Sequence, residues 1–92
     1  MDNLQNRRRR IREAILEELA NTPRGYMQPQ KALAASVRLS IVPPPSEVEL
    51  DEALARLEAD AMIHCDVTAL GVKRWCITGI GRAALYEACS PA

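Results

Sequence analysis

The side chains best able to do chemistry in this sequence are one histidine and three cysteines: His64, Cys65, Cys76 and Cys89. Imidazole and thiolate are common zinc ligands, but the spacing is poor for a metal site. Alternation along a strand would leave only His64 and Cys76 on one face, unless Asp66 or Cys89 joined them. An odd number of cysteines without a C-x-x-C pair fits reduced thiols in a cytoplasmic protein better than disulfides. We therefore expect no metal site and no cofactor.

Catalysis by a nucleophile has equally little support. A nucleophile needs a base beside it and a third group that orients the base. The only histidine, His64, falls in a segment expected to form an exposed hairpin, with no second base candidate next to it. We therefore expect a protein without catalytic residues.

The charged residues form local clusters, although the chain as a whole is neutral. Twelve basic and twelve acidic residues leave its 92 residues without net charge at pH 7, so any electrostatic function depends on those clusters. The candidate phosphate contacts are Arg7, Arg8, Arg9, Arg10, Arg12, Lys31, Lys73 and Arg74, with Gln28 and Gln30 as accessory contacts. Four consecutive arginines spread around a helix, so a solubilising or partner-contact role stays open beside phosphate binding.

Helices are the main scaffold that must position these residues. Apolar side chains recur three or four positions apart in four segments, at residues 3–20, 29–39, 46–61 and 78–89. Ser46 and Glu49 form an S-x-x-E capping box at the start of the third segment, and Thr78 can cap the fourth. Because the chain can build only one core, we predict a single domain over residues 1–92.

A hairpin is predicted between the last two helices, over residues 62–78, where apolar and polar side chains alternate. A three-residue loop that ends with Gly71 in the left-handed conformation sets its register. That register pairs Ile63 with Ile77, Cys65 with Trp75, Val67 with Lys73, Asp66 with Arg74 and His64 with Cys76. A short edge strand is predicted at Tyr26 and Met27. The expected class is mainly α with a small β-hairpin, in the order α-(β)-α-α-β-β-α.

This order resembles the winged helix-turn-helix domains of bacterial and phage transcription regulators. Residues 54–63 (LARLEADAMI) resemble the exit of the family's recognition helix, and residues 75–85 (WCITGIGRAAL) resemble the start of its last helix. The chain is also similar to small winged helix proteins of prophages. The resemblance covers about residues 7–88 and implies DNA binding, with the third helix in the major groove and the hairpin, or wing, on the DNA backbone.

The third helix carries the wrong charge for that activity. Between residues 47 and 60 there are six acidic residues and one arginine, a net charge of minus five. A helix that reads base edges offers arginine, lysine, asparagine or glutamine and keeps carboxylates away from phosphates. We therefore predict a small DNA-binding regulator that contacts phosphate through its basic N-terminal helix and the wing, without help from the third helix. The alternative is a protein-interaction or assembly module that docks through Glu47, Glu49, Asp51 and Glu52.

Double-stranded DNA, a second copy of the chain and another protein are thus the candidate partners. The first and last helices are the elements through which winged helix proteins commonly pair, which implies a homodimer through Leu85 and Tyr86. Leu4, Ile41 and Val42 are apolar residues that we expect outside the main core, where they would favour an interface. No apolar run is long enough for a membrane span, so no membrane contact is expected.

Overall fold

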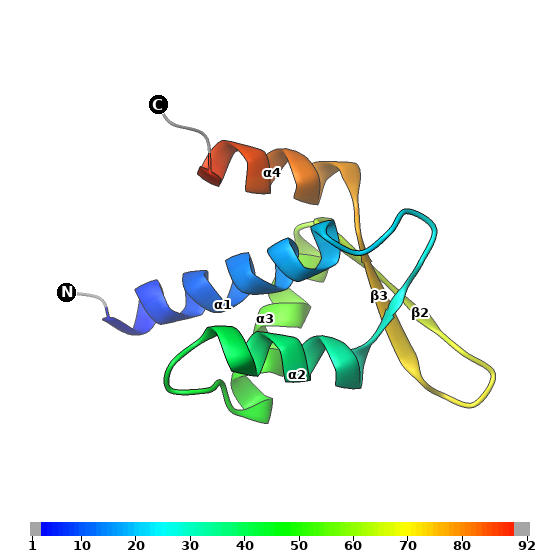
Figure 1. Ribbon diagram of the computed structural model, residues 1–92, viewed down its shortest axis with the longest axis horizontal. Coiled ribbons are helices and arrows are strands. Elements are labelled where there is room, and N and C mark those ends of the chain that lie inside the picture. The colour runs from blue at the N-terminus through cyan, green and yellow to red at the C-terminus, as the bar shows by residue number, and fades with distance from the viewer. Residues whose placement is uncertain (1–2, 90–92) are drawn as a thin grey trace.

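Four helices and a small sheet make up the chain in the computed structural model, which describes residues 3–89 and the side chains up to residue 87 (Figure 1). The elements are α1 (Asn3–Ala20), β1 (Gln28–Pro29), α2 (Gln30–Ser40), α3 (Glu47–Ala59), β2 (Ile63–Val67), β3 (Lys73–Ile77) and α4 (Gly79–Cys89). The expected mainly helical α+β class is confirmed. None of the described helices is both long and apolar enough to cross a membrane.

The sheet has three antiparallel strands in the order β1-β3-β2. All five predicted pairs of the β2–β3 hairpin are present, including Cys65 with Trp75 and Asp66 with Arg74. Gly71 has a positive φ of 81°, and the Gly71 amide donates to the Thr68 carbonyl, so the predicted left-handed loop residue is also confirmed.

The first strand lies two residues later than predicted. It consists of Gln28 and Pro29, which pair with Trp75 and Arg74 of β3. Tyr26 cannot extend this strand because its amide already donates to the Pro23 carbonyl, which closes a turn. The prediction of a strand at Tyr26 and Met27 was therefore wrong in position.

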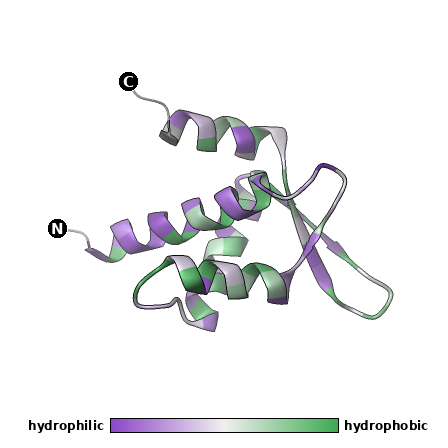
Figure 2. Cartoon of the chain, viewed as in Figure 1, coloured by the Kyte–Doolittle hydropathy of each residue, from purple (hydrophilic) through white to green (hydrophobic). Residues whose placement is uncertain are grey.

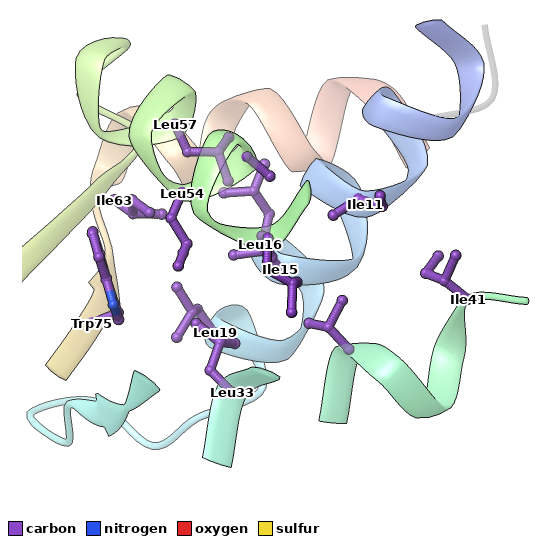
Figure 3. Packing of buried hydrophobic residues seen from close by; sticks show 13 residues of the cluster. Ile11, Ile15, Leu16, Leu19, Leu33, Ile41, Leu54, Leu57, Ile63 and Trp75 are labelled. Atoms are coloured by element: carbon purple, nitrogen blue, oxygen red, sulfur yellow. The ribbon is translucent and has the colours of Figure 1, made fainter. Parts of the chain in front are cut away.

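The hydrophobic core lies between α1, α2, α3 and the sheet (Figure 3). Ile11, Ile15 and Leu19 of α1 form its centre, and Trp75 closes it on the side of the sheet. Leu4 and Val42 are exposed, as expected, but Ile41 is only 4% exposed, so its predicted exposure was wrong. Ile41 caps the C-terminus of α2 with extended backbone, and its side chain joins the core cluster.

The two ends of α3 are capped by different motifs. At its start the predicted capping box is present: Ser46 Oγ accepts from the Glu49 amide, and the Glu49 carboxylate accepts from the Ser46 amide. At its end the Met62 amide donates to the Leu57 carbonyl and the Ala61 amide donates to the Glu58 carbonyl. This Schellman arrangement requires a left-handed residue, and Ala61 supplies it with φ 61°. The helix therefore ends at Ala59, before the predicted residue 61.

The start of α4 is packed against the end of α3. Thr78 Oγ1 accepts from the Gly81 amide, as expected of a capping residue, and donates to the Ala61 carbonyl. A Cβ atom at Gly81 would lie 2.1 Å from the Met62 carbonyl oxygen, whereas one at Gly79 would meet nothing within 4 Å. Gly81 thus allows α4 to approach the chain that links α3 to β2.

Candidate functional site

A groove of about 960 Å³ lies between α2, α3 and the β2–β3 hairpin. Its floor is formed by Leu33 of α2, Leu50 and Leu54 of α3, and Trp75 of β3. These four side chains are buried members of the core, and the Trp75 Nε1 atom donates to Gln30 Oε1 at the groove wall over 2.9 Å. The groove therefore has a fixed apolar floor whose indole N–H is already satisfied.

The two walls of the groove carry charges of opposite sign. The α3 wall presents the carboxylates of Glu47, Asp51 and Glu58, whose spacing puts them on one side of the helix. The facing wall presents the basic side chains of Lys31 and Arg38 from α2 and Lys73 from β3. We call these the acidic wall and the basic wall.

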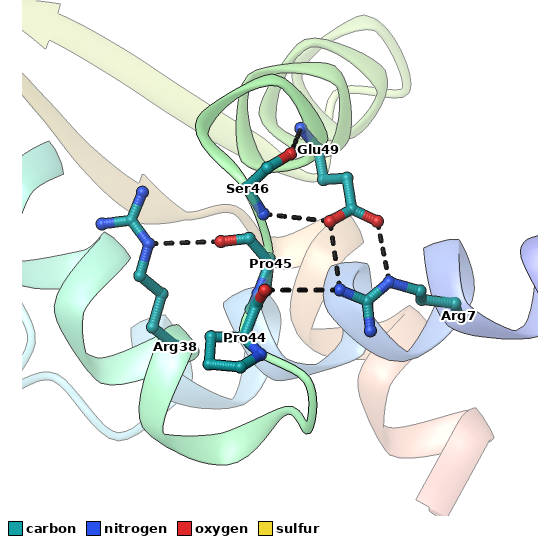
Figure 4. Close-up of polar contacts among 6 residues, drawn as sticks. All are labelled: Arg7, Arg38, Pro44, Pro45, Ser46 and Glu49. Atoms are coloured by element: carbon teal, nitrogen blue, oxygen red, sulfur yellow. Dashed lines mark hydrogen bonds and ion pairs between the residues drawn. The ribbon is translucent and has the colours of Figure 1, made fainter.

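No ion pair within the described residues neutralises either wall. Arg38 donates to the Pro45 carbonyl over 3.2 Å, which anchors its guanidinium beside the α2–α3 turn (Figure 4). Near the hairpin, burial raises the pKa of the Cys65 thiol, the negative charges of Glu58 and Asp66 raise it further, and the positive charge of Lys73 opposes this. The groove is thus a charge-separated surface whose charges are available to an occupant.

The arginine run of α1 does not act as one surface. Arg7 Nε lies 2.7 Å from Glu49 Oε2, and Arg7 Nη2 lies 3.0 Å from Glu49 Oε1 and 3.5 Å from the Pro44 carbonyl (Figure 4). The Arg7 and Glu49 side chains are 21% and 28% exposed. The Arg7 hydrogen bonds and the bond from the Ser46 amide lower the pKa of Glu49 to about 2. Arg7, a predicted phosphate contact, and Glu49, a predicted docking residue, are therefore bonded to each other.

The remaining arginines of α1 divide between two surroundings. Arg8 and Arg12 line a hollow of about 170 Å³ with Glu52 and Arg56 of α3. Arg8 is nevertheless exposed, as are Arg9 and Arg10, and Arg9 Nε lies 4.0 Å from Glu13 Oε2 within the same helix. The structure thus brings part of the predicted basic surface onto α3 and leaves the rest facing solvent.

The hairpin has only one of its two predicted phosphate contacts, Lys73, free of an ion pair among the described residues. Arg74 pairs with Asp66 across the strands, as the predicted register required, while Lys73 remains exposed. Of the accessory residues, Gln28 is buried, where its side chain accepts from Thr22 and donates to Glu18. Gln28 is therefore part of the fold at the end of α1, not an accessible contact.

The histidine and cysteines show no metal site within the described part of the chain. His64 is exposed opposite Cys76, and Cys65 is half-buried on the other face, as the register predicted. The side chain of Cys89 lies outside the described residues.

Exposed apolar residues at the end of the hairpin are a feature that the sequence reasoning missed. Val67, Leu70 and Val72, which we call the hairpin tip, are all exposed, with Leu70 at 92%. Figure 2 shows hydrophobic colouring at the end of the hairpin. Val67 shares a strand face with the buried Ile63, but it is exposed because the hairpin extends beyond the core at this point. The sequence of the loop already contained this information, because residues 68–72 (TALGV) include no basic residue. A loop that contacts a nucleic acid backbone favours basic and polar residues.

Comparisons with protein-family models, curated proteins and solved structures found no match. The function must therefore be argued from the charge, burial and contacts of the residues described above.

Proposed function

We propose that the chain is a winged helix domain that docks a protein through the groove between α2, α3 and the hairpin. The order of the elements and the antiparallel sheet β1-β3-β2 support the fold assignment. In that fold α2 and α3 form the helix-turn-helix and the β2–β3 hairpin is the wing. The groove then occupies the face with which such domains commonly meet their partner.

The acidic wall is the observation that carries the proposal. Glu47, Asp51 and Glu58 follow the groove side of α3, where a DNA-reading helix would place donors for base edges. Carboxylates on this side would approach phosphates instead of neutralising them, which opposes the electrostatic term that supplies most non-specific DNA affinity. The same carboxylates are favourable toward basic side chains of a protein partner.

The apolar hairpin tip supports the same assignment. Leu70 and Val72 lie where a DNA-binding wing would carry basic residues, and Val72 also borders the groove. An apolar edge beside a charged groove is typical of a protein interface, where the centre loses water and the rim stays polar.

Affinity capture with a matched control tests the proposal. The tagged chain is compared with an Asp51→Lys, Glu58→Lys variant and with a control that carries Glu17→Lys and Glu87→Lys, two exposed carboxylates away from the groove. We expect a partner that the native chain and the control retain and the groove variant loses. Equal recovery by all three chains would contradict docking at the groove.

DNA binding through α1 is the second candidate, and the exposure of Arg8, Arg9 and Arg10 favours it. These arginines, with Arg12, Lys31 and Lys73, could contact phosphates without help from α3. The test measures binding of a fluorescent random duplex at about 50 and 200 mM salt, for the native chain and for a variant with the three exposed arginines changed to alanine. Binding that falls with salt and disappears in the variant supports this candidate, and no binding at low salt rejects it. Arg7 is left unchanged because it holds Glu49.

A further inference from the structure

The charges of the groove form a pattern that is complementary to itself. The acidic wall runs along α3, and the basic wall runs along α2 and the hairpin. A two-fold axis that runs along the groove, between its walls, exchanges the walls, so the acidic wall of one copy meets the basic wall of the other, and the reverse. A face with charges of one sign would repel its own copy, but this face does not.

From this self-complementarity we infer that the occupant of the groove is a second copy of the chain, in a two-fold dimer formed through α2, α3 and the hairpin. The inference rests on the proposed function, because it names the partner that docks there. It differs from the dimer through α1 and α4 that the family resemblance implied.

Two further observations agree with a second copy. The chain has no net charge at pH 7, so two copies do not repel each other at long range. The exposed Leu70 and Val72 extend the groove face beyond its charged walls, and a two-fold axis brings the hairpin of each copy toward the other. Burial of these apolar side chains on association adds to the pairing of the walls.

The walls can be changed without disturbing the fold. Asp51, Glu58, Lys31 and Lys73 are exposed, and within the described residues their side chains form no hydrogen bond or ion pair. Asp51→Lys with Glu58→Lys leaves Glu47 in the acidic wall but gives both walls a net positive charge. Lys31→Glu with Lys73→Glu leaves Arg38 in the basic wall but gives both walls a net negative charge. Circular dichroism and urea unfolding check that both variants stay folded, and Asp51→Asn with Glu58→Gln is a milder variant of the acidic wall.

The experiment is sedimentation velocity of the native chain, of each variant and of an equimolar mixture, at about 100 µM protein and about 50 mM salt. We expect a native dimer that weakens at about 500 mM salt, because the Debye length shortens. Each variant alone should dimerise about a hundredfold more weakly, since like charges then face each other. The mixture should restore the dimer as a heterodimer, because basic walls meet acidic walls at both halves of the interface.

A native chain that stays monomeric overturns the dimer. Variants that dimerise as well as the native chain also overturn the groove dimer. They would place the interface on another face, such as that of α4, where Ile80 and Tyr86 are exposed. A mixture that remains monomeric overturns it as well. These results leave the proposed function open to its own test, because affinity capture detects a different groove-dependent protein even when the chain is monomeric.

Discussion

The two flanks of α3 carry similar carboxylates and use them differently. On the flank that faces α1, Glu49 is bonded to Arg7 and Ser46, and Glu52 borders a hollow lined by arginines. On the flank that faces the groove, Glu47, Asp51 and Glu58 have no ion-pair partner within the described residues. The comparison shows that acidic composition alone does not identify a docking surface. The partner across each flank decides whether a carboxylate stabilises the fold or is available for binding.

The largest expected loss of stability is at the junction of α3 and α4. As on the two flanks of α3, similar residues lie here in different surroundings: Gly81 is tightly packed and Gly79 is in open space. Gly81→Ala brings a Cβ to 2.1 Å from the Met62 carbonyl oxygen, so the backbone must move. We expect a loss of about 2 kcal/mol or more in the free energy of unfolding, measured with urea. Gly79→Ala, in open space, should raise stability by about 0.5 kcal/mol. Equal effects of the two substitutions would show that α4 does not pack as described.

Ser46→Ala removes the side-chain cap at the first turn of α3, beside the flank that faces α1. The Glu49 amide loses its acceptor and the capping box is incomplete, so we expect a loss of about 1 kcal/mol in urea unfolding. Asp51→Asn, on the groove flank, should change stability by less than about 0.5 kcal/mol. A loss from Asp51→Asn as large as that from Ser46→Ala would remove the distinction between the flanks.

Ala61→Gly is expected to relieve backbone strain at the other end of α3. A left-handed conformation is costly for alanine and readily accessible to glycine, whose greater freedom in the unfolded chain offsets part of the gain. The net result should be a stabilisation of roughly 0.5 kcal/mol in thermal or urea unfolding. Ala59→Gly, at the last residue of α3, should have the opposite sign, and a loss of stability in both variants would contradict the Schellman arrangement.

The pH dependence of stability is a further way to separate the two flanks of α3. The pKa of Glu49 falls from 4.5 to about 2 on folding, so its ionisation stabilises the folded chain fully above pH 4.5 and progressively less as the pH falls toward 2. The stability difference between the native chain and Glu49→Gln should therefore shrink over this window. Stability curves of the native chain and of Glu49→Gln that run parallel over this window would contradict the assignment of Glu49.

Local rules were sufficient for much of the fold. Alternation and the Gly71 loop determine the hairpin register because the paired residues are close in sequence, and the capping box involves residues only three positions apart. The pairing of Arg7 with Glu49 spans 42 residues, so no local pattern could reveal that a predicted phosphate contact and a predicted docking residue neutralise each other. The burial of Ile41 likewise depends on how the proline turn directs the chain back toward the core.

The site was predicted in part for the same reason. The net negative charge of the third helix already indicated an acidic surface that includes Glu47 and Asp51. The basic wall brings together Lys31, Arg38 and Lys73 from two separate elements, and this arrangement becomes visible only when α2 and the hairpin are packed.

Urea unfolding of two double charge reversals tests the contrast between the flanks most directly. Asp51→Lys with Glu58→Lys and Glu49→Lys with Glu52→Lys change the net charge equally, one pair on each flank. At a protein concentration low enough to keep the chain monomeric, we predict that the groove pair leaves the free energy of unfolding within about 0.5 kcal/mol of the native value, while the pair facing α1 lowers it clearly. Equal losses from both pairs, or a greater loss from the groove pair, would contradict the account.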